Sequence, residues 1–225
     1  VKIEQGVDGK ALKITIATNS NNFIVKDNKI TKSTPIITAP PKKEVIKNKV
    51  VLDAGHGGSD YGAIREGINE KDITLDITQR VASILKSKGY KVALTRADDT
   101  YVSLQDRVEF SENETPEIFV SIHVNSAVAV EPKGIETHYY HDYSKELARV
   151  VQNHLIKDIN TKDRGLLKSK FYVINHTTVP AILIETGFIS NEEERNELVT
   201  DSRKQKTAKA IAEGIIEYIK SQQKK

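Results

Sequence analysis

The stretch VVLDAGHGGSD, residues 50–60, decides the fold of this sequence. A short apolar run leads into Asp53, and His56 follows between glycines. This pattern is typical of a buried strand that releases its chain into a turn at the edge of a sheet. Taken alone, His56 is more often a loop residue bonded to nearby backbone than a functional group. Its role therefore depends on the rest of the chain.

The composition is that of a globular protein. Of 225 residues, 38% are hydrophobic and 29% are charged, and this length allows one domain with appendages or two small domains. No run approaches the roughly 18 consecutive apolar residues of a membrane-spanning helix, so we expect no transmembrane segment. The chain begins at Val1, which is typical of a processed chain that has lost a signal peptide.

The absence of cysteine excludes disulfides and cysteine-based zinc or nucleophile chemistry, which leaves histidine, aspartate and glutamate as metal ligands. The net charge of +3 is only mildly basic. A local lysine cluster fits a solvated linker, because no aromatic residues alternate with a basic stripe as they do in single-strand nucleic-acid binders. We therefore expect no nucleic-acid partner. The cluster consists of Lys42, Lys43, Lys47 and Lys49.

The chain divides into three parts. Residues 1–30 contain two short predicted strands, at 11–16 and 22–25, around a polar turn. Residues 31–48 hold prolines among lysines, which is typical of an extended linker. The main domain spans residues 49–222.

Strands and helices alternate in the main domain. This alternation predicts an α/β domain with a largely parallel or mixed central sheet and helices on both faces. Apolar residues at helical spacing predict helices around 73–85, 147–155 and 208–219, and two capping-box motifs, Ser103 with Asp106 and Ser190 with Glu193, predict two more. The predicted strands, mostly continuous apolar runs, are 49–54, 90–96, 117–123, 134–140, 170–174 and 181–187.

Three chemically capable side chains follow apolar strands at their carboxyl ends, where α/β sheets bind ligands: His56, His123 and Glu185. Two histidines with one carboxylate form the ligand set of a hydrolytic zinc site that keeps its fourth position for water. A second, unligated carboxylate would transfer the water's proton to the leaving group, and Glu185 has the right position.

Glu70 lies at the predicted start of the first helix, just past the loop that contains His56. Its position alone is explained by the helix dipole, which favours an acidic residue there by about 0.3 to 1 kcal/mol. The sequence lacks an HExxH motif, so the ligands of any zinc site must come from distant segments.

Six motifs occur in order over residues 50–219: VVLDAGHGGSDYGA, NEKD, VALTRADDTYVSLQDR, FVSIHVNSA, RGLLKSKFYVI and PAILIETGFISN. In these motifs the chain resembles the zinc-dependent N-acetylmuramoyl-L-alanine amidases, the type called amidase 3. The resemblance implies a three-layer fold with a twisted, mostly parallel six-stranded sheet. It also implies one zinc ion bound by His56, Glu70 and His123, with Glu185 as the catalytic residue.

The resemblance implies hydrolysis of the amide bond between the lactyl group of N-acetylmuramic acid and the L-alanine of the stem peptide in peptidoglycan. We accordingly expect a secreted monomer that works in the cell wall or periplasm. Two alternatives stay open: a catalytically silent wall-binding protein, and a metallopeptidase of the same fold that acts on another amide. Residues 1–30 resemble the tail of the AMIN cell-wall targeting module.

Two further residues are candidates for substrate binding. Asn125 lies two positions after His123 and either hydrogen-bonds the substrate or caps a loop. Arg164 either binds a stem-peptide carboxylate or forms a surface ion pair. Arg107 is predicted to pair structurally with an acidic neighbour. The other histidines are predicted to lie on element faces (His138, His154), in a turn (His141) and in a loop near the site (His176).

The sequence departs from the family pattern beside His56. Tyr61 stands where the family has proline, and Ile64 with Arg65 replaces a small turn, so we expect a differently shaped loop. Some relatives insert a regulatory helix after the second histidine. Here only residues 124–133 separate His123 from Gly134, which predicts an uncapped site.

Overall fold

The computed structural model describes residues 2–5, 12–15, 23–26, 29–32 and 44–224. The chain forms two compact units, Val1–Lys43 and Glu44–Lys225. The first unit contains two antiparallel pairs of strands. Of these four strands, the second and the third overlap the two strands that were predicted at 11–16 and 22–25. The pairs are β1 (Lys2–Gln5) with β2 (Leu12–Thr15), and β3 (Phe23–Lys26) with β4 (Lys29–Lys32). The similarity to an AMIN tail stays a prediction, and residues 33–43 of the predicted linker lie outside the described residues.

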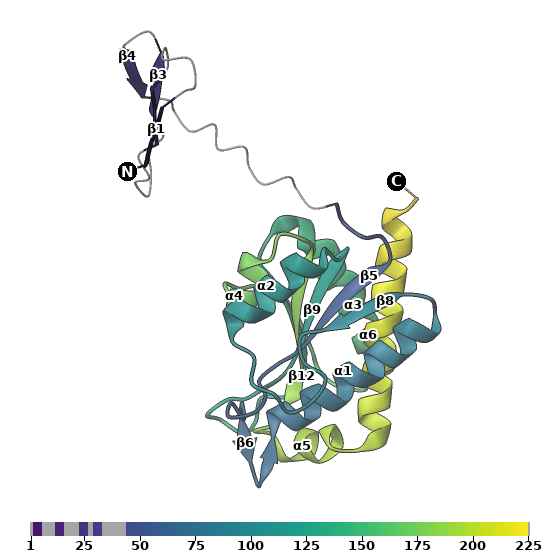
Figure 1. Ribbon diagram of the computed structural model, residues 1–225. Coiled ribbons are helices and arrows are strands. Elements are labelled where there is room, and N and C mark those ends of the chain that lie inside the picture. The colour runs from purple at the N-terminus through teal and green to yellow at the C-terminus, as the bar shows by residue number, and fades with distance from the viewer. Residues whose placement is uncertain (1, 6–11, 16–22, 27–28, 33–43, 225) are drawn as a thin grey trace. The chain divides into compact units, whose positions relative to one another are not determined.

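The second unit is built on a six-stranded sheet with the strand order β11-β10-β12-β9-β5-β8 (Figure 1). All neighbouring strands run parallel except β10 and β12, which are antiparallel. The predicted six-stranded, mostly parallel sheet is therefore confirmed. Its strands are β5 (Lys49–Ala54), β8 (Lys91–Leu94), β9 (Ile118–Asn125), β10 (Ile135–Tyr139), β11 (Asp163–Lys168) and β12 (Ala181–Phe188).

Helices cover both faces of this sheet, with α1 and α6 on one side and α2 and α4 on the other (Figure 1). Successive residues of a strand face opposite sides. Val50 and Leu52 accordingly join the larger core, with α1, α3 and α6, while Val51 joins the smaller core beside α2 and α4. The helices are α1 (Glu70–Ser87), α2 (Leu104–Glu114), α3 (Lys145–Asp158), α4 (Tyr172–His176), α5 (Glu192–Leu198) and α6 (Asp201–Gln222).

The short connections complete the domain. The hairpin of β6 (Ile64–Arg65) and β7 (Ile68–Asn69) precedes α1, and the 3-10 helix η1 (Asp142–Ser144) precedes α3. No helix in the described part of the chain is long and apolar enough to cross a membrane.

One predicted strand is wrong. Residues 170–174 were expected to pair in the sheet, but Tyr172–His176 form helix α4, whose Val173 and Ile174 fill the smaller core. A short apolar run fits a buried helical turn as well as a strand. The sixth strand is instead β11, an edge strand that shows no continuous apolar run because much of it is exposed.

The two predicted capping motifs have different outcomes. The Ser103 hydroxyl accepts a hydrogen bond from the Asp106 N–H, as the capping box predicts. The second motif is displaced by one residue, because Asn191 rather than Ser190 caps α5 and accepts from the Glu194 N–H. An asparagine directly before a helix satisfies the same backbone donors as serine does.

Candidate metal centre

Three side chains from separate elements converge beyond the carboxyl ends of β5 and β9. Donor atoms of His56, Glu70 and His123 all lie within 4.8 Å of one another, and no other such group occurs in the described part of the chain. Glu70 Oε1 is 3.2 Å from His56 Nε2 and 3.1 Å from His123 Nδ1. Two imidazole nitrogens and one carboxylate oxygen are donors that suit zinc.

His56 lies in the turn that follows β5, with a left-handed backbone (φ 62°) that non-glycine residues seldom adopt. The Arg107 guanidinium secures this turn by donating to the His56 carbonyl at 2.7 Å. The Nδ1 atom of the ring lies 2.8 Å from Asp60 Oδ2. A hydrogen bond from Nδ1–H to this carboxylate leaves the Nε2 lone pair directed at the site.

Buried arginines fix the backbone just before His56. Arg107 donates to the Asp53 carboxylate and to the Ala54 carbonyl, both at 2.6 Å, and Arg96 also donates to the Ala54 carbonyl at 3.0 Å. Burial alone would raise the pKa of Asp53, but the Arg107 charge and hydroxyl donors outweigh it and hold that pKa below its usual value. The predicted pairing of Arg107 with an acidic neighbour is confirmed.

Glu70 is the first residue of α1, where the sequence placed it. Its carboxylate accepts the backbone N–H of Ala63 at 2.9 Å and of Val124 at 3.0 Å. Burial raises the pKa of Glu70, but hydrogen bonds and charge from His123 and His56 lower it far below its usual range. The carboxylate is therefore ionised, and its Oε1 atom lies between the two imidazoles.

Two glycines make room for these groups. A Cβ atom on Gly62, whose φ is 65°, would lie 2.6 Å from Glu70 Oε2. A Cβ atom on Gly55 would lie 2.3 Å from the His123 ring. Gly55 of the opening motif and Gly62 of the loop that follows are thus required by close packing against the ligands.

Glu185 lies on β12, directly beside His123 of the neighbouring strand β9. Its side chain is buried, and among the described residues its Oε2 atom has no hydrogen-bond partner. Burial raises the pKa of Glu185 well above its usual value, and the negative charges of Glu70 and Glu136 raise it further. The site thus contains one carboxyl group whose proton affinity is high and whose oxygen is not already engaged.

A cavity of about 380 Å³ joins these groups. Its polar lining includes the three potential ligands, Glu185 and Asn125, and apolar side chains from the starts of α2 and α4 and from the loops before these helices form its rim. The exposed apolar residues of the rim are Tyr101, Leu104, Phe171 and Tyr172.

The two predicted substrate-binding residues lie in different places. Asn125 lines the cavity beside Glu185, whereas Arg164 does not line it. Arg164 Nε donates instead to Glu136 at 2.7 Å. Sequence reasoning missed Glu136, because its proximity to the site follows from the antiparallel pairing of β10 with β12, which no local pattern encodes.

The loops around the cavity contain the positions at which this sequence departs from the family pattern. Ile64 and Arg65 form a strand of the β6–β7 hairpin, and the Lys71 ammonium lies 4.1 Å from the centroid of the Tyr61 ring. Residues 126–134, which connect β9 to β10, contain no helix. No helix in this described connection covers the site.

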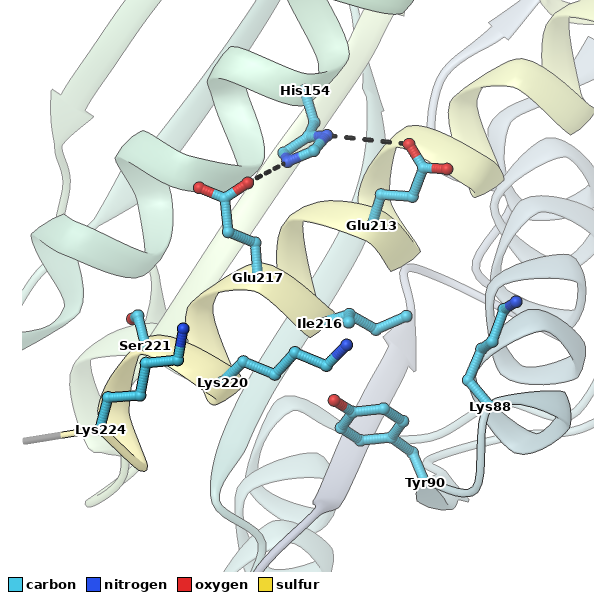
Figure 2. Close-up of a pocket in the computed structure, with 9 residues that line it drawn as sticks. All are labelled: Lys88, Tyr90, His154, Glu213, Ile216, Glu217, Lys220, Ser221 and Lys224. Carbon is cyan, nitrogen blue, oxygen red and sulfur yellow. Dashed lines mark hydrogen bonds and ion pairs between the residues drawn. The ribbon is translucent and has the colours of Figure 1, made fainter.

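The remaining histidines lie outside the cluster. A larger cavity of about 710 Å³ holds His154 of α3, which lies 2.9 Å from Glu217 and 3.9 Å from Glu213 of α6 (Figure 2). This histidine therefore links two helix faces, as predicted. His176 was expected in a loop but ends α4, where it stacks on Tyr172, because the segment is helical.

Comparisons with known proteins agree with this geometry. Residues 50–217 match the Amidase_3 family, described as N-acetylmuramoyl-L-alanine amidase. The chain is 37% identical over 212 residues to the N-acetylmuramoyl-L-alanine amidase LytC of Bacillus subtilis (strain 168), a match that covers 92% of this chain but only 42% of LytC.

Solved structures give the same result. The catalytic domain of CwlV, an N-acetylmuramoyl-L-alanine amidase from Bacillus (Paenibacillus) polymyxa var. colistinus, has a TM-score of 0.76 and 39% identity, covering 78% of this chain and 99% of that domain. The N-acetylmuramoyl-L-alanine amidase AmiC2 of Nostoc punctiforme has a TM-score of 0.75 and 41% identity, covering 79% and 99%. With a family match that runs from β5 into α6, the chain belongs to the N-acetylmuramoyl-L-alanine amidase family.

Proposed function

We propose that the second unit hydrolyses the amide bond between the lactyl group of N-acetylmuramic acid and the L-alanine of the stem peptide in peptidoglycan. The observation that carries this proposal is the convergence of three metal donors with the unpaired carboxyl oxygen of Glu185 in one cavity. Hydrolysis at such a site needs exactly this combination of three protein ligands and a nearby proton acceptor. The amidases among the relatives and solved structures support the choice of bond.

His56, Glu70 and His123 would hold one zinc ion. The fit rests on their donor set and on the two distances from Glu70 Oε1 to the imidazole nitrogens. When bound, zinc supplies Lewis-acid chemistry, which polarises the scissile carbonyl and makes water more acidic. The Asp60 carboxylate holds the His56 ring in the orientation that this role requires.

Glu185 carries the proton. Its carboxyl group accepts a proton from the attacking water and then donates it to the departing L-alanine nitrogen. The raised pKa of Glu185 suits the second step, because a carboxyl group with an ordinary pKa donates poorly at neutral pH. Its burial also keeps bulk water away from the carboxyl oxygen during the transfer.

Asn125 and Arg164 contact the rest of the substrate. Asn125 lines the cavity and supplies an amide group beside the scissile bond. Arg164 lies outside the cavity, where its Nε donates to Glu136 and its guanidinium carbon lies 4.8 Å from the centroid of the Phe188 ring. Its two terminal nitrogens have no hydrogen-bond partner in the part of the chain that the structure describes, and they would bind a stem-peptide carboxylate. All these side chains come from one chain, so the activity needs only a monomer. Peptidoglycan as substrate places the enzyme outside the cytoplasm, secreted to the cell wall or periplasm.

The test is mass spectrometry of peptidoglycan fragments after digestion by the zinc-loaded protein. We expect products with a new lactyl carboxyl group and a new L-alanine amino group. New termini at any other bond would indicate a peptidase of the same fold, and unchanged fragments that stay bound would indicate a wall-binding protein. Either result would contradict the proposal.

Glu185→Gln is the matched variant for this test. It preserves the size of the side chain but cannot accept the proton, so turnover should fall by roughly 10²-fold or more. Zinc content, measured by atomic absorption, should stay at one ion per chain. A Glu185→Gln protein with wild-type turnover would exclude Glu185 as the proton carrier.

A further inference from the structure

Glu136 lies in the same row of the sheet as two residues of the site. On β10 it pairs with Glu185 of β12, and Glu185 in turn pairs with His123 of β9. Directly opposed residues project from the same face, with Cβ atoms about 4.5 to 5.5 Å apart. The row therefore places three ionisable side chains on one face of the sheet, and Glu136 is the one to which the proposed reaction assigns no contact.

Both oxygens of the buried Glu136 carboxylate are occupied. Oε1 accepts a hydrogen bond from Asn125 Nδ2 at 2.8 Å and lies 3.3 Å from His138 Nε2. Oε2 accepts a hydrogen bond from Arg164 Nε at 2.7 Å. The carboxylate thus joins the two residues that are proposed to contact the substrate.

These contacts fix the orientation of the Asn125 amide. Its Oδ1 atom accepts from the Ser126 N–H at 2.7 Å, and its Nδ2 atom donates one hydrogen to Glu136. An amide nitrogen carries two hydrogens, so one N–H remains for another acceptor. Asn125 lines the cavity together with His123 and Glu185, while Glu136 does not line it.

We propose that Glu136 is a positioning residue, whose carboxylate holds the Asn125 amide so that its second N–H donates to a carbonyl oxygen of the substrate. This inference rests on the proposed function of the site. Glu136 acts through Asn125 and does not touch the substrate itself. The same carboxylate sets the direction of the Arg164 guanidinium on the neighbouring strand β11.

A carboxylate can hold both the Asn125 amide and the Arg164 guanidinium. It offers acceptors on both oxygens, whereas glutamine offers one acceptor and one donor. In Glu136→Gln, the new NH₂ group must face either Asn125 Nδ2 or Arg164 Nε, and both are donors. The amide of Asn125 then loses its fixed orientation, although the size of the side chain at position 136 is unchanged.

A double-mutant cycle on a soluble muropeptide tests this role. Asn125→Ala and Glu136→Gln should each lower kcat/KM about tenfold, as the loss of one well-placed hydrogen bond does. The decisive double variant combines Asn125→Ala with Glu136→Asp, which keeps the charge that raises the pKa of Glu185. It should be no worse than Asn125→Ala alone, because Glu136 acts through the amide that is already missing. The loss should appear mainly as a higher KM, since Asn125 does not move the reacting proton. Losses that multiply in the double variant would overturn the proposal.

The control is Glu193→Gln, which removes an exposed carboxylate that pairs with Lys133 and should leave kcat/KM unchanged. Glu136→Asp is the second variant if Glu136→Gln does not fold. It keeps the charge but withdraws the carboxylate by one methylene, so a smaller loss of kcat/KM is expected, again absent in the Asn125→Ala background.

Nuclear magnetic resonance of the Asn125 side-chain amide provides a readout that does not depend on turnover. Its hydrogens should exchange slowly with water in the wild-type protein and faster in Glu136→Gln and Glu136→Asp. An amide that is equally protected in the variants would overturn the proposal. If the wild-type protein released no product, the proposed function would fail, while this measurement would still decide whether Glu136 holds the amide.

Discussion

Two residues of the metal centre, His56 and Glu70, are each held by a second contact outside the ligand cluster. For His56 this contact is Asp60, and for Glu70 it is the N–H groups of Ala63 and Val124. Such contacts orient ligands before the ion arrives, and their loss typically weakens metal binding 10- to 100-fold. The geometry of the centre therefore resides in the surrounding loops as much as in the ligands.

Glu70 and Asp72 allow the ligand role to be separated from a helix-dipole role. Both acidic residues lie in the first turn of α1, but Asp72 is exposed and does not contact the histidines. Glu70→Ala should lower zinc affinity by at least about 10-fold, whereas Asp72→Ala should leave it unchanged. Competition with a chromogenic chelator measures both affinities. If Glu70→Ala still bound one zinc ion per chain with wild-type affinity, Glu70 would not be a ligand and would only interact with the helix dipole.

Asp53 should make the fold sensitive to acid. Because the pKa of Asp53 is lowered in the folded state, its contribution to the free energy of unfolding is complete above its usual value of 3.8 and is lost as the pH falls through the lowered value. Asp53→Asn leaves the buried Arg107 charge uncompensated, which should cost about 3 to 5 kcal/mol at pH 7.

Urea unfolding between about pH 2 and 7 tests this prediction, and the difference between wild type and Asp53→Asn should shrink at the acid end. The control is Asp142→Asn, which breaks the exposed pair with Lys168 and should cost at most about 1 kcal/mol. A difference that stays constant with pH would contradict the role assigned to the Asp53–Arg107 pair.

At the scale of single residues, the sequence identified those site residues whose chemical type and position in the chain both indicated a functional role. His56 follows an apolar strand, His123 and Glu185 lie near the carboxyl ends of two others, and the structure places all three around one cavity with Glu70. Their catalytic and metal-binding roles stay proposals. Position alone did not distinguish Glu70 from a dipole-stabilising residue, because its contact with the histidines depends on how the loop at 57–69 folds back.

At the crossing of α3 and α6, the backbones of the two helices approach each other closely at Gly214. A Cβ atom on Gly214 of α6 would lie 2.8 Å from the Cα atom of Val151 in α3. Both helices belong to the larger core that supports the sheet beneath the site. A close contact with backbone cannot be relieved by a change of rotamer, so the helices themselves would have to move apart.

Gly214→Ala should therefore destabilise the domain by about 1 to 3 kcal/mol, which exceeds the gain of roughly 1 kcal/mol in helix propensity. Urea unfolding measures the effect, and Lys209→Ala, an exposed change on the same helix, should be nearly neutral. Stabilisation by Gly214→Ala would show that α3 and α6 separate without cost.

At the scale of elements, periodicity predicted the long helices and the buried strands, because their residues face a core on fixed sides. It failed at residues 170–174, where only packing against Phe119 and Leu183 decides between helix and strand. It also missed β11, because an exposed edge strand carries little apolar pattern.

In the catalytic unit as a whole, sheet topology brings the site together. β5, β9 and β12 are parallel neighbours, so the side chains that follow or end them meet at one edge. The antiparallel strand β10 then places Glu136 at the same level as Glu185. The α/β class and a largely parallel or mixed sheet followed from the sequence, but the strand order and the antiparallel direction of β10 did not, because they depend on contacts between distant segments.

The central claim is that one ion lies among His56, Glu70 and His123 while Glu185 stays uncoordinated. Anomalous diffraction at the zinc absorption edge, on crystals of the zinc-loaded protein, tests it most directly. We predict a single peak in each catalytic unit, within coordination distance of these three side chains, with both Glu185 oxygens outside that distance. A peak bound by other donors, or one that takes Glu185 as a ligand, would contradict the account.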